Sequence, residues 1–440
     1  MSKKLLALFA VLAILVLIPV FAAQSRTTEY HVKGRKIAKD TTLNMTLPDG
    51  KFLTGTIKGP TGAVVKGASV FVGDAADRFS GFAGVTDTAG KFSVPVQPGT
   101  KYLVVGPPAS ASVDPSKFSR LLDKTVEGIN VSKDTAYGNV NLQNGFILSG
   151  KVDPPAGTAT PFLFIPSIQI FLKKKLTLVD VAQTGGTNQA ILNKYAVALP
   201  AGTYRLLSRA TALTQAFQAV PMLPKLDQVK VSKDTVKNIA MAKGGYSFSG
   251  TLKDASGKRL DGILYIVPKS GVFKGWPIQA ITVIKGVFGL MPGMNIADSF
   301  VPAGTYTLVF IPYGFTTVGY SGKATITYFD LTMPAAAKTQ ALVAKNGFVV
   351  SGKVVDANGK AAKAAITAFS SGAPLNVDLL GLNFAFAQTD GKGQYRFTLP
   401  AGTFNIMATP TASSAAAARR PEEIMRRMML RAVSNGSVPF

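Results

Sequence analysis

A short phrase recurs four times along this chain, and its regular spacing constrains the fold more than any other feature. The copies are Val96–Thr100, Leu199–Tyr204, Val301–Tyr306 and Leu399–Phe404, and each contains the dipeptide Gly-Thr. Their glycines lie about 100 residues apart. The proline and glycine of such a phrase form a turn, and the alternation after it is typical of a β-strand. The spacing therefore predicts four structural units.

Two further phrases keep the same spacing. One ends in a glycine, as in Phe52–Gly55, Phe146–Gly150, Tyr246–Gly250 and Phe348–Gly352. The other is Lys-Asp-Thr, around Asp40, Asp134 and Asp234, and it decays to Ala337–Thr339 in the last copy. Short runs rich in Val, Ile, Phe and Thr lie between these phrases, without helical periodicity. The predicted fold class is all-β, a tandem array of four antiparallel Ig-like or transthyretin-like β-sandwich units.

The Lys-Asp-Thr phrases suggest where one unit ends and the next begins. Division near each phrase gives units at 30–125, 126–226, 227–328 and 329–412. We expect the strand of each phrase to pair ahead, with the unit that follows it. In the alternative, the N-terminal strand completes the fourth unit and closes a ring.

Unit one contains Leu53–Ile57, Gly67–Val72 and Thr86–Phe92, and unit four contains Thr389–Tyr395. With these motifs the chain resembles the carboxypeptidase regulatory-like domain, a transthyretin-like or prealbumin-like sandwich related to carbohydrate-binding-like folds. Units two and three match this pattern less completely. The resemblance implies a fold rather than an activity, because its motifs are turn motifs and no peptidase zinc site accompanies them.

Both termini depart from the repeat. Lys3 and Lys4 precede an apolar run and the small residues Ala22 and Ala23, which predicts a signal peptide over 1–23; an uncleaved anchor is the alternative. The expected localisation is secreted, periplasmic or cell surface. Residues 413–440 predict a short basic amphipathic helix, with a disordered tail as the alternative.

Composition argues against catalysis. The chain has no cysteine and one histidine, His31, which we interpret as a solvated residue of the lead-in segment. No zinc-hydrolase, thiol-redox, serine-esterase or P-loop motif occurs. Asp87 and Asp390 lie in Thr-Asp-x-x-Gly turns, where a carboxylate accepts backbone hydrogen bonds. We therefore predict that the protein is not an enzyme and binds no cofactor or metal.

The formal net charge of +25 favours anionic surroundings. The expected partners are anionic cell-envelope polymers or glycans and other protein chains. Specific nucleic-acid binding is not expected, and membrane contact is expected only through an uncleaved signal segment or the C-terminal helix.

The predicted function is a non-catalytic exported scaffold, spacer or adhesion protein. The first alternative is a polysaccharide-binding protein, in which Phe273, Trp276 and Tyr313 form an aromatic platform for a ligand. The second alternative is a subunit of a cell-surface assembly.

Overall fold

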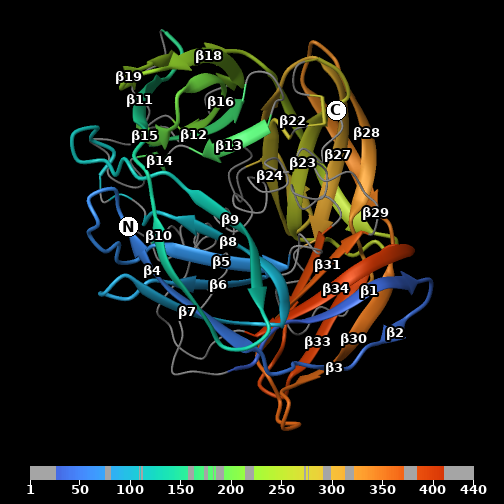
Figure 1. The fold of residues 1–440 in the computed structure, drawn as a ribbon. Helices are drawn as coiled ribbons and strands as arrows, with labels where there is room; N and C mark the ends of the chain where they lie inside the picture. Colours follow the sequence, from blue (N-terminus) through green and yellow to red (C-terminus); the bar gives the residue numbers. More distant parts are fainter. Residues whose placement is uncertain are drawn as a thin grey trace, which may run out of the picture.

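The computed structural model describes residues 26–74, 81–108, 110, 112–156, 163–172, 177–181, 183–184, 193–213, 222–271, 274–275, 277–290, 299–312, 322–370 and 384–410. All regular elements in these ranges are β-strands (Figure 1). In the same ranges, no helix has the length and apolar character needed to cross a membrane. The predicted signal peptide and C-terminal helix lie outside them.

Unit one comprises the strands between Lys51 and Asn141, not the predicted range 30–125, and consists of two sheets. The later units are displaced from their predicted ranges in the same way, and the last one also takes in strands from residues 30–46. The three-stranded sheet has the order β10 (Thr135–Asn141), β4 (Lys51–Lys58), β7 (Lys91–Val96). The four-stranded sheet has the order β6 (Gly81–Val85), β5 (Ser69–Asp74), β8 (Gly99–Gly106), β9 (Lys124–Val131). Alternate side chains of the strands, among them Leu53, Phe92 and Leu103, form a buried cluster, as expected of two packed layers.

Unit two repeats this plan. Its first sheet joins β11 (Phe146–Asp153), β14 (Gln183–Thr184), β15 (Lys194–Leu199), β19 (Thr235–Val236) and β20 (Ile239–Ala240). Its second sheet has the order β13 (Thr177–Val181), β12 (Leu163–Leu172), β16 (Gly202–Leu213), β18 (Lys225–Val231). A separate ribbon pairs β17 (Met222–Leu223) with β21 (Ala242–Lys243). Leu148, Tyr195 and Leu206 belong to its buried cluster.

Unit three follows the same plan, except that its strands form one continuous eight-stranded sheet. The strands are β22 (Tyr246–Asp254), β23 (Gly262–Pro268), β24 (Gln279–Ile284), β25 (Val287–Phe288), β26 (Phe300–Val301), β27 (Gly304–Pro312), β28 (Thr327–Met333) and β29 (Lys338–Ala344). The sheet is continuous because β25 bonds to both β22 and β24. Phe248, Phe288 and Leu308 lie in its buried cluster.

Unit four takes strands from both ends of the chain. Its C-terminal strands are β30 (Phe348–Val355), β31 (Ala364–Ser370), β32 (Phe384–Gln388), β33 (Gln394–Leu399) and β34 (Gly402–Pro410). Its N-terminal strands are β1 (Tyr30–Ile37), β2 (Thr41–Thr42) and β3 (Met45–Thr46). β1 lies antiparallel to β34, whereas β2 and β3 lie parallel to β30. In Figure 1 the blue N-terminal strands accordingly lie beside the red C-terminal ones.

This arrangement closes a ring, so the expectation that each Lys-Asp-Thr strand pairs ahead is wrong. β10 pairs with β4, β19 with β11 and β29 with β22, in each case back within its own unit. The physical reason is the tight turn before β10. β9 pairs with β8 of unit one, and only three residues separate β9 from β10. This connection is too short for β10 to reach another unit. The alternative of a closed ring is the arrangement observed.

The expectation of purely antiparallel sheets is also wrong at these strands, since β10, β19, β29 and β2 each run parallel to their partner. β9 and β10 turn a corner between the two sheets rather than forming a hairpin within one, and this corner sets the direction of β10. The glycine of the second phrase admits the parallel strand. A Cβ on Gly352 would lie 2.0 Å from the Leu43 carbonyl oxygen, and one on Gly250 would lie 1.9 Å from that of Gln340.

Two of the strands that begin at a Gly-Thr phrase, β8 and β27, are buried on both faces. In β8, Leu103 and Val105 lie in the core of unit one, while Tyr102 and Val104 form a second cluster with Phe71. In β27, Leu308 and Phe310 lie in the core of unit three, while Val309 and Ile311 join Val267 and Ile326. This double burial explains the nearly continuous apolar runs in the sequence.

Candidate functional site

The Lys-Asp-Thr phrases form turns that hold the aspartate in a fixed direction. In each turn the threonine hydroxyl donates a hydrogen bond to the carbonyl oxygen of the lysine two residues earlier. The pairs are Thr41 with Lys39 at 2.8 Å, Thr135 with Lys133 at 2.7 Å and Thr235 with Lys233 at 2.7 Å. Such a bond stabilises a turn locally.

Each aspartate then accepts a backbone hydrogen bond from the first strand of its own unit. The Oδ1 atoms of Asp134, Asp234 and Asp40 lie 3.0 Å from the amide nitrogens of Phe52, Ile147 and Val349, respectively. The bond ties the turn to the end of the parallel partner strand and leaves the second carboxylate oxygen available.

The remaining partner of each aspartate is a cation from the neighbouring unit. Arg26 of unit four donates two bonds, of 2.9 and 2.8 Å, to Asp134 of unit one. Arg120 of unit one pairs in the same bidentate manner with Asp234 of unit two. Lys323 of unit three lies 3.0 Å from Asp40 of unit four. We call these three ion pairs the junction clamps.

The backbone of each cation is also fixed to the next unit. The amides of Gly50, Gly145 and Gly347 donate to the carbonyl oxygens of Arg26, Arg120 and Lys323 at 2.6, 2.7 and 2.7 Å, respectively. Each of these glycines directly precedes the first strand of a unit. A junction clamp therefore combines a side-chain ion pair with a backbone hydrogen bond at the same residue.

The clamps alter the acidity of their members. The Arg26 guanidinium and the Phe52 amide lower the pKa of Asp134 to about 2. The Arg120 side chain and the Ile147 amide lower the pKa of Asp234. For Asp40 the Val349 amide is the larger cause of a lowered pKa, and the Lys323 ammonium is the second. All three carboxylates are thus held in the charged form, which is the form that binds the cation.

The junction between units two and three has no such clamp among the described residues. Lys338 pairs with Phe248, which places Ala337 where the other units have the aspartate. On the cation side, residues 214–224 contain no lysine or arginine. Both charged partners are therefore missing from the same junction, and β17 with β21 forms a short ribbon there instead.

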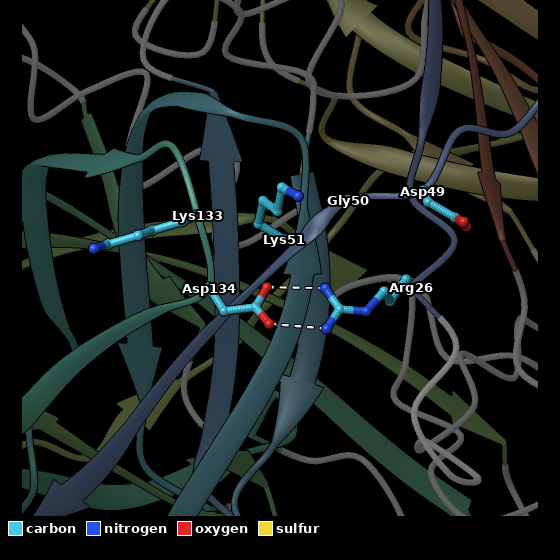
Figure 2. A pocket seen from close by; sticks show the side chains of 6 residues that line it. All are labelled: Arg26, Asp49, Gly50, Lys51, Lys133 and Asp134. Carbon is cyan, nitrogen blue, oxygen red and sulfur yellow. Dashed lines mark hydrogen bonds and ion pairs between the residues drawn. The ribbon is translucent and has the colours of Figure 1, made fainter.

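The clamp between units four and one borders an open cleft of about 700 Å³ (Figure 2). Its lining consists of Arg26, Asp49, Gly50, Lys51, Lys133 and Asp134. The Arg26 guanidinium also lies 4.9 Å from the centre of the Phe52 ring, a cation–π contact. In Figure 2 the Lys133 side chain points away from the ion pair. This arrangement can fix two units and present positive charge, but it lacks a nucleophile next to a general base.

The aromatic residues predicted to bind a ligand, Phe273, Trp276 and Tyr313, lie outside the described residues, so that site stays a prediction. His31 does not lie in a solvated lead-in segment; it is part of β1 and pairs with Met407. Within the part of the chain that the structure describes, no group of three or more His, Cys, Asp or Glu side chains could hold a metal ion.

The structural role predicted for Asp87 and Asp390 is confirmed. Asp87 Oδ1 accepts hydrogen bonds from the amides of Ala89 and Lys91 at 2.9 and 2.8 Å. Asp390 Oδ1 accepts two equivalent bonds, both of 2.8 Å, from the amides of Lys392 and Gln394. These carboxylates hold the turns before β7 and β33.

Sequence reasoning identified the recurring aspartates but missed their cationic partners. Arg26, Arg120 and Lys323 each lie about 24 residues before the glycine that opens the next unit. That spacing was available as a signal. The three residues are not surrounded by a common phrase, however, and an ion pair between units depends on how the units pack.

Comparison with known proteins leaves the family open. No family model and no curated protein matches the chain, so the resemblance to carboxypeptidase regulatory-like domains stays a prediction. Among solved structures, the Bacillus anthracis TIE protein is 12% identical over 68% of this chain and 51% of its own, with a TM-score of 0.18. This chain thus spans about half the length of that protein.

Two pilins are similar at the same low level. The major pilin subunit BcpA of Bacillus cereus is 11% identical over 67% of this chain and 99% of its own, with a TM-score of 0.16. GBS52, the minor pilin of Streptococcus agalactiae, is 11% identical over 44% of this chain and 96% of its own, with a TM-score of 0.22. Such TM-scores mean that the chains do not superimpose as wholes, so no functional conclusion rests on these proteins.

Proposed function

We propose that this protein is an exported, non-catalytic scaffold of the cell surface, in which four transthyretin-like β-sandwich units close into a ring that serves adhesion or assembly. The observation that carries the proposal is the pairing of β1, β2 and β3 with β34 and β30. Because the first strands of the chain pair with strands of the last unit, they fix the relative positions of all four units.

Ring closure favours a platform over an extended spacer. In a spacer, the first and last units lie far apart so that the chain gains reach. Here Tyr30 pairs with Ala408 and Ile37 with Gly402, which brings the two ends of the described chain together. The junction clamps add polar bonds between neighbouring units at three places. Each exposed ion pair contributes little stabilising free energy by itself, but the three together restrict the angle between units.

The charge pattern supports contact with acidic surfaces. Lys39, Lys133 and Lys233 are exposed at equivalent turns, next to the three clamped aspartates. Because the ring repeats this turn, it presents similar positive points in several directions. Anionic cell-envelope polymers are the partner class that fits this pattern and the net charge of +25.

The test begins with the location of the protein. A lysine-reactive label that does not cross membranes should modify it on intact cells of its source organism. Deletion of the gene should then reduce attachment of the cells to surfaces or to one another, and the wild-type gene should restore it. A variant with Asp40→Ala, Asp134→Ala and Asp234→Ala should restore less, because its units are no longer held in fixed positions.

A matched control is Asp330→Ala, which removes an exposed ion pair with Lys269 inside unit three and leaves every junction intact. It should restore attachment fully. Labelling only after cell lysis, or normal attachment of the deletion strain, would contradict the proposal. Saturable binding of the purified protein to a neutral glycan, lost on Trp276→Ala, would favour the polysaccharide-binding alternative instead.

A further inference from the structure

The segment that closes the ring is held by non-covalent contacts alone. Residues 30–46 supply β1 to β3, and Leu47 to Gly50 connect them to β4 of unit one. The segment buries Ile37, Met45 and Leu47 in the core of unit four, each at 1% exposure or less. No cysteine exists to lock it in place. Unit four is therefore completed by strands that precede unit one in the chain and that no covalent cross-link holds in place.

The polar contacts of this segment are as specific as those within a unit. Asn44 Oδ1 accepts a bond of 2.9 Å from the Lys353 amide, and the Tyr395 hydroxyl donates one of 2.6 Å to the Leu43 carbonyl oxygen. Asp40 contacts Val349 and Lys323 as described above. All of these bonds join the N-terminal segment to units three and four. The same segment from a second copy of the chain can make every one of them.

The junction between units two and three supplies the place at which the ring can open. Among the described residues it is the junction without a clamp, so separation there breaks none of the three ion pairs. If two opened chains exchange their N-terminal segments, unit four of each chain is completed by β1 to β3 of the other. The clamp from Arg26 to Asp134 then stays within one chain, and the clamp from Lys323 to Asp40 forms between the two chains.

We infer that this chain can form a strand-exchanged dimer, in which the β1–β3 segment of each copy completes unit four of the other. The partner is a second copy of the same chain. The exchanged dimer keeps all strand pairs and all three clamps of the single ring and changes only the unclamped junction. Exchange of identical elements between copies is a low-cost route to a dimer, because closure within one chain and closure between chains use the same contacts. This inference rests on ring closure and does not depend on the proposed function.

The test uses two single-cysteine variants, Lys36→Cys and Thr403→Cys. These residues are exposed and lie directly opposite each other in the pairing of β1 with β34. Because the natural chain has no cysteine, a disulfide between them in a mixture joins two chains, and it forms most readily if β1 of one chain pairs with β34 of another. The variants are unfolded together, refolded at high protein concentration and salt to screen the net charge, and oxidised.

We expect a disulfide-linked heterodimer that increases with the refolding concentration, and a mass of twice the monomer by light scattering. The matched control mixes Thr403→Cys with Lys258→Cys, which lies in an exposed turn of unit three and should cross-link far less. A double variant with Lys36→Cys and Thr403→Cys, refolded at low concentration, should close within one chain as a monomer.

Two outcomes would overturn the inference. One is a monomeric mass at every protein concentration, with cross-linking no higher than in the control. The other is a dimer in which the Lys36→Cys and Thr403→Cys chains do not cross-link preferentially, since this would mean association through a different surface.

Discussion

Replacement of Leu47 by alanine should destabilise the far end of the chain rather than the unit that follows it in sequence. Leu47 is fully buried and belongs to the core of unit four, together with Val350, Phe397 and Ile406. Its amide also donates a hydrogen bond of 2.8 Å to the Val355 carbonyl oxygen. The side chain therefore links residue 47 to strands that lie about 300 residues later.

The expected loss follows from this burial. A fully buried leucine replaced by alanine costs about 2–5 kcal/mol, through lost apolar transfer energy and the cavity left behind. Since each 1.4 kcal/mol changes an equilibrium tenfold, opening of unit four should become roughly 30-fold or more easier. The backbone bond to Val355 is retained in the variant, so the effect is that of packing.

Hydrogen exchange with mass spectrometry measures this opening strand by strand. In the Leu47→Ala protein, peptides from β30 and β33 should exchange faster, while those from β4 and β7 should keep their protection. Leu142→Ala is the matched control. Leu142 is 1% exposed, lies in the core of unit one and donates from its amide to the Lys58 carbonyl oxygen. In the Leu142→Ala protein, peptides from β4 and β7 should exchange faster, while those from β30 and β33 should keep their protection.

Faster exchange of β4 and β7 in Leu47→Ala, with β30 and β33 unchanged, would refute the reasoning. That result would mean that the N-terminal strands pair ahead with unit one and that no ring is closed.

Three other perturbations test separate parts of the structure. Gly352→Ala would place a Cβ 2.0 Å from the Leu43 carbonyl oxygen, so it should displace the closing segment; faster proteolysis between residues 26 and 50 would show this, and unchanged proteolysis would contradict it. Lys101 is 1% exposed, and its ammonium lies 3.2 Å from the partly exposed Asp74 carboxylate. It occupies the position of Tyr204 in unit two, whose hydroxyl donates to the Pro200 carbonyl oxygen, so Lys101→Tyr should leave the melting temperature unchanged or raise it. A clear fall would show that the ion pair with Asp74 stabilises unit one. The pKa of Asp134 is lowered to about 2 in the folded chain, so its charged form stabilises the folded state above about pH 4, and this stabilisation is lost as the pH falls towards 2. The urea concentration at the unfolding midpoint should therefore fall across this pH range, and less steeply in Asp134→Asn. The same pH dependence in both proteins would contradict the clamp.

Much of the architecture follows from local signals in the sequence. The Gly-Thr phrases correctly mark the starts of β8, β16, β27 and β34. The turns at Asp87 and Asp390 also behave as their residue types predict. These features depend on a few neighbouring residues and on backbone preferences, which a sequence displays directly.

The sequence predicted only the acidic half of the candidate site. The Lys-Asp-Thr phrase revealed Asp40, Asp134 and Asp234, because turn chemistry recurs in the sequence. Their partners Arg26, Arg120 and Lys323 lie in segments without a shared phrase, and a cation can pair with any carboxylate that packing brings within reach. The absence of an aspartate was visible in the sequence as the decay to Ala337, but only the structure showed that the described residues form no clamp between units two and three.

The sequence by itself determined the number of repeats, the strand-rich class and the turns. Only the tertiary structure decided which unit receives the first strands. A strand that carries the Lys-Asp-Thr phrase has the same local pattern whether it pairs with β4 or with β30, because both present the same alternation and the same glycine. The choice depends on long-range contacts, in which Ile37, Met45 and Leu47 fill the core of unit four and close the ring.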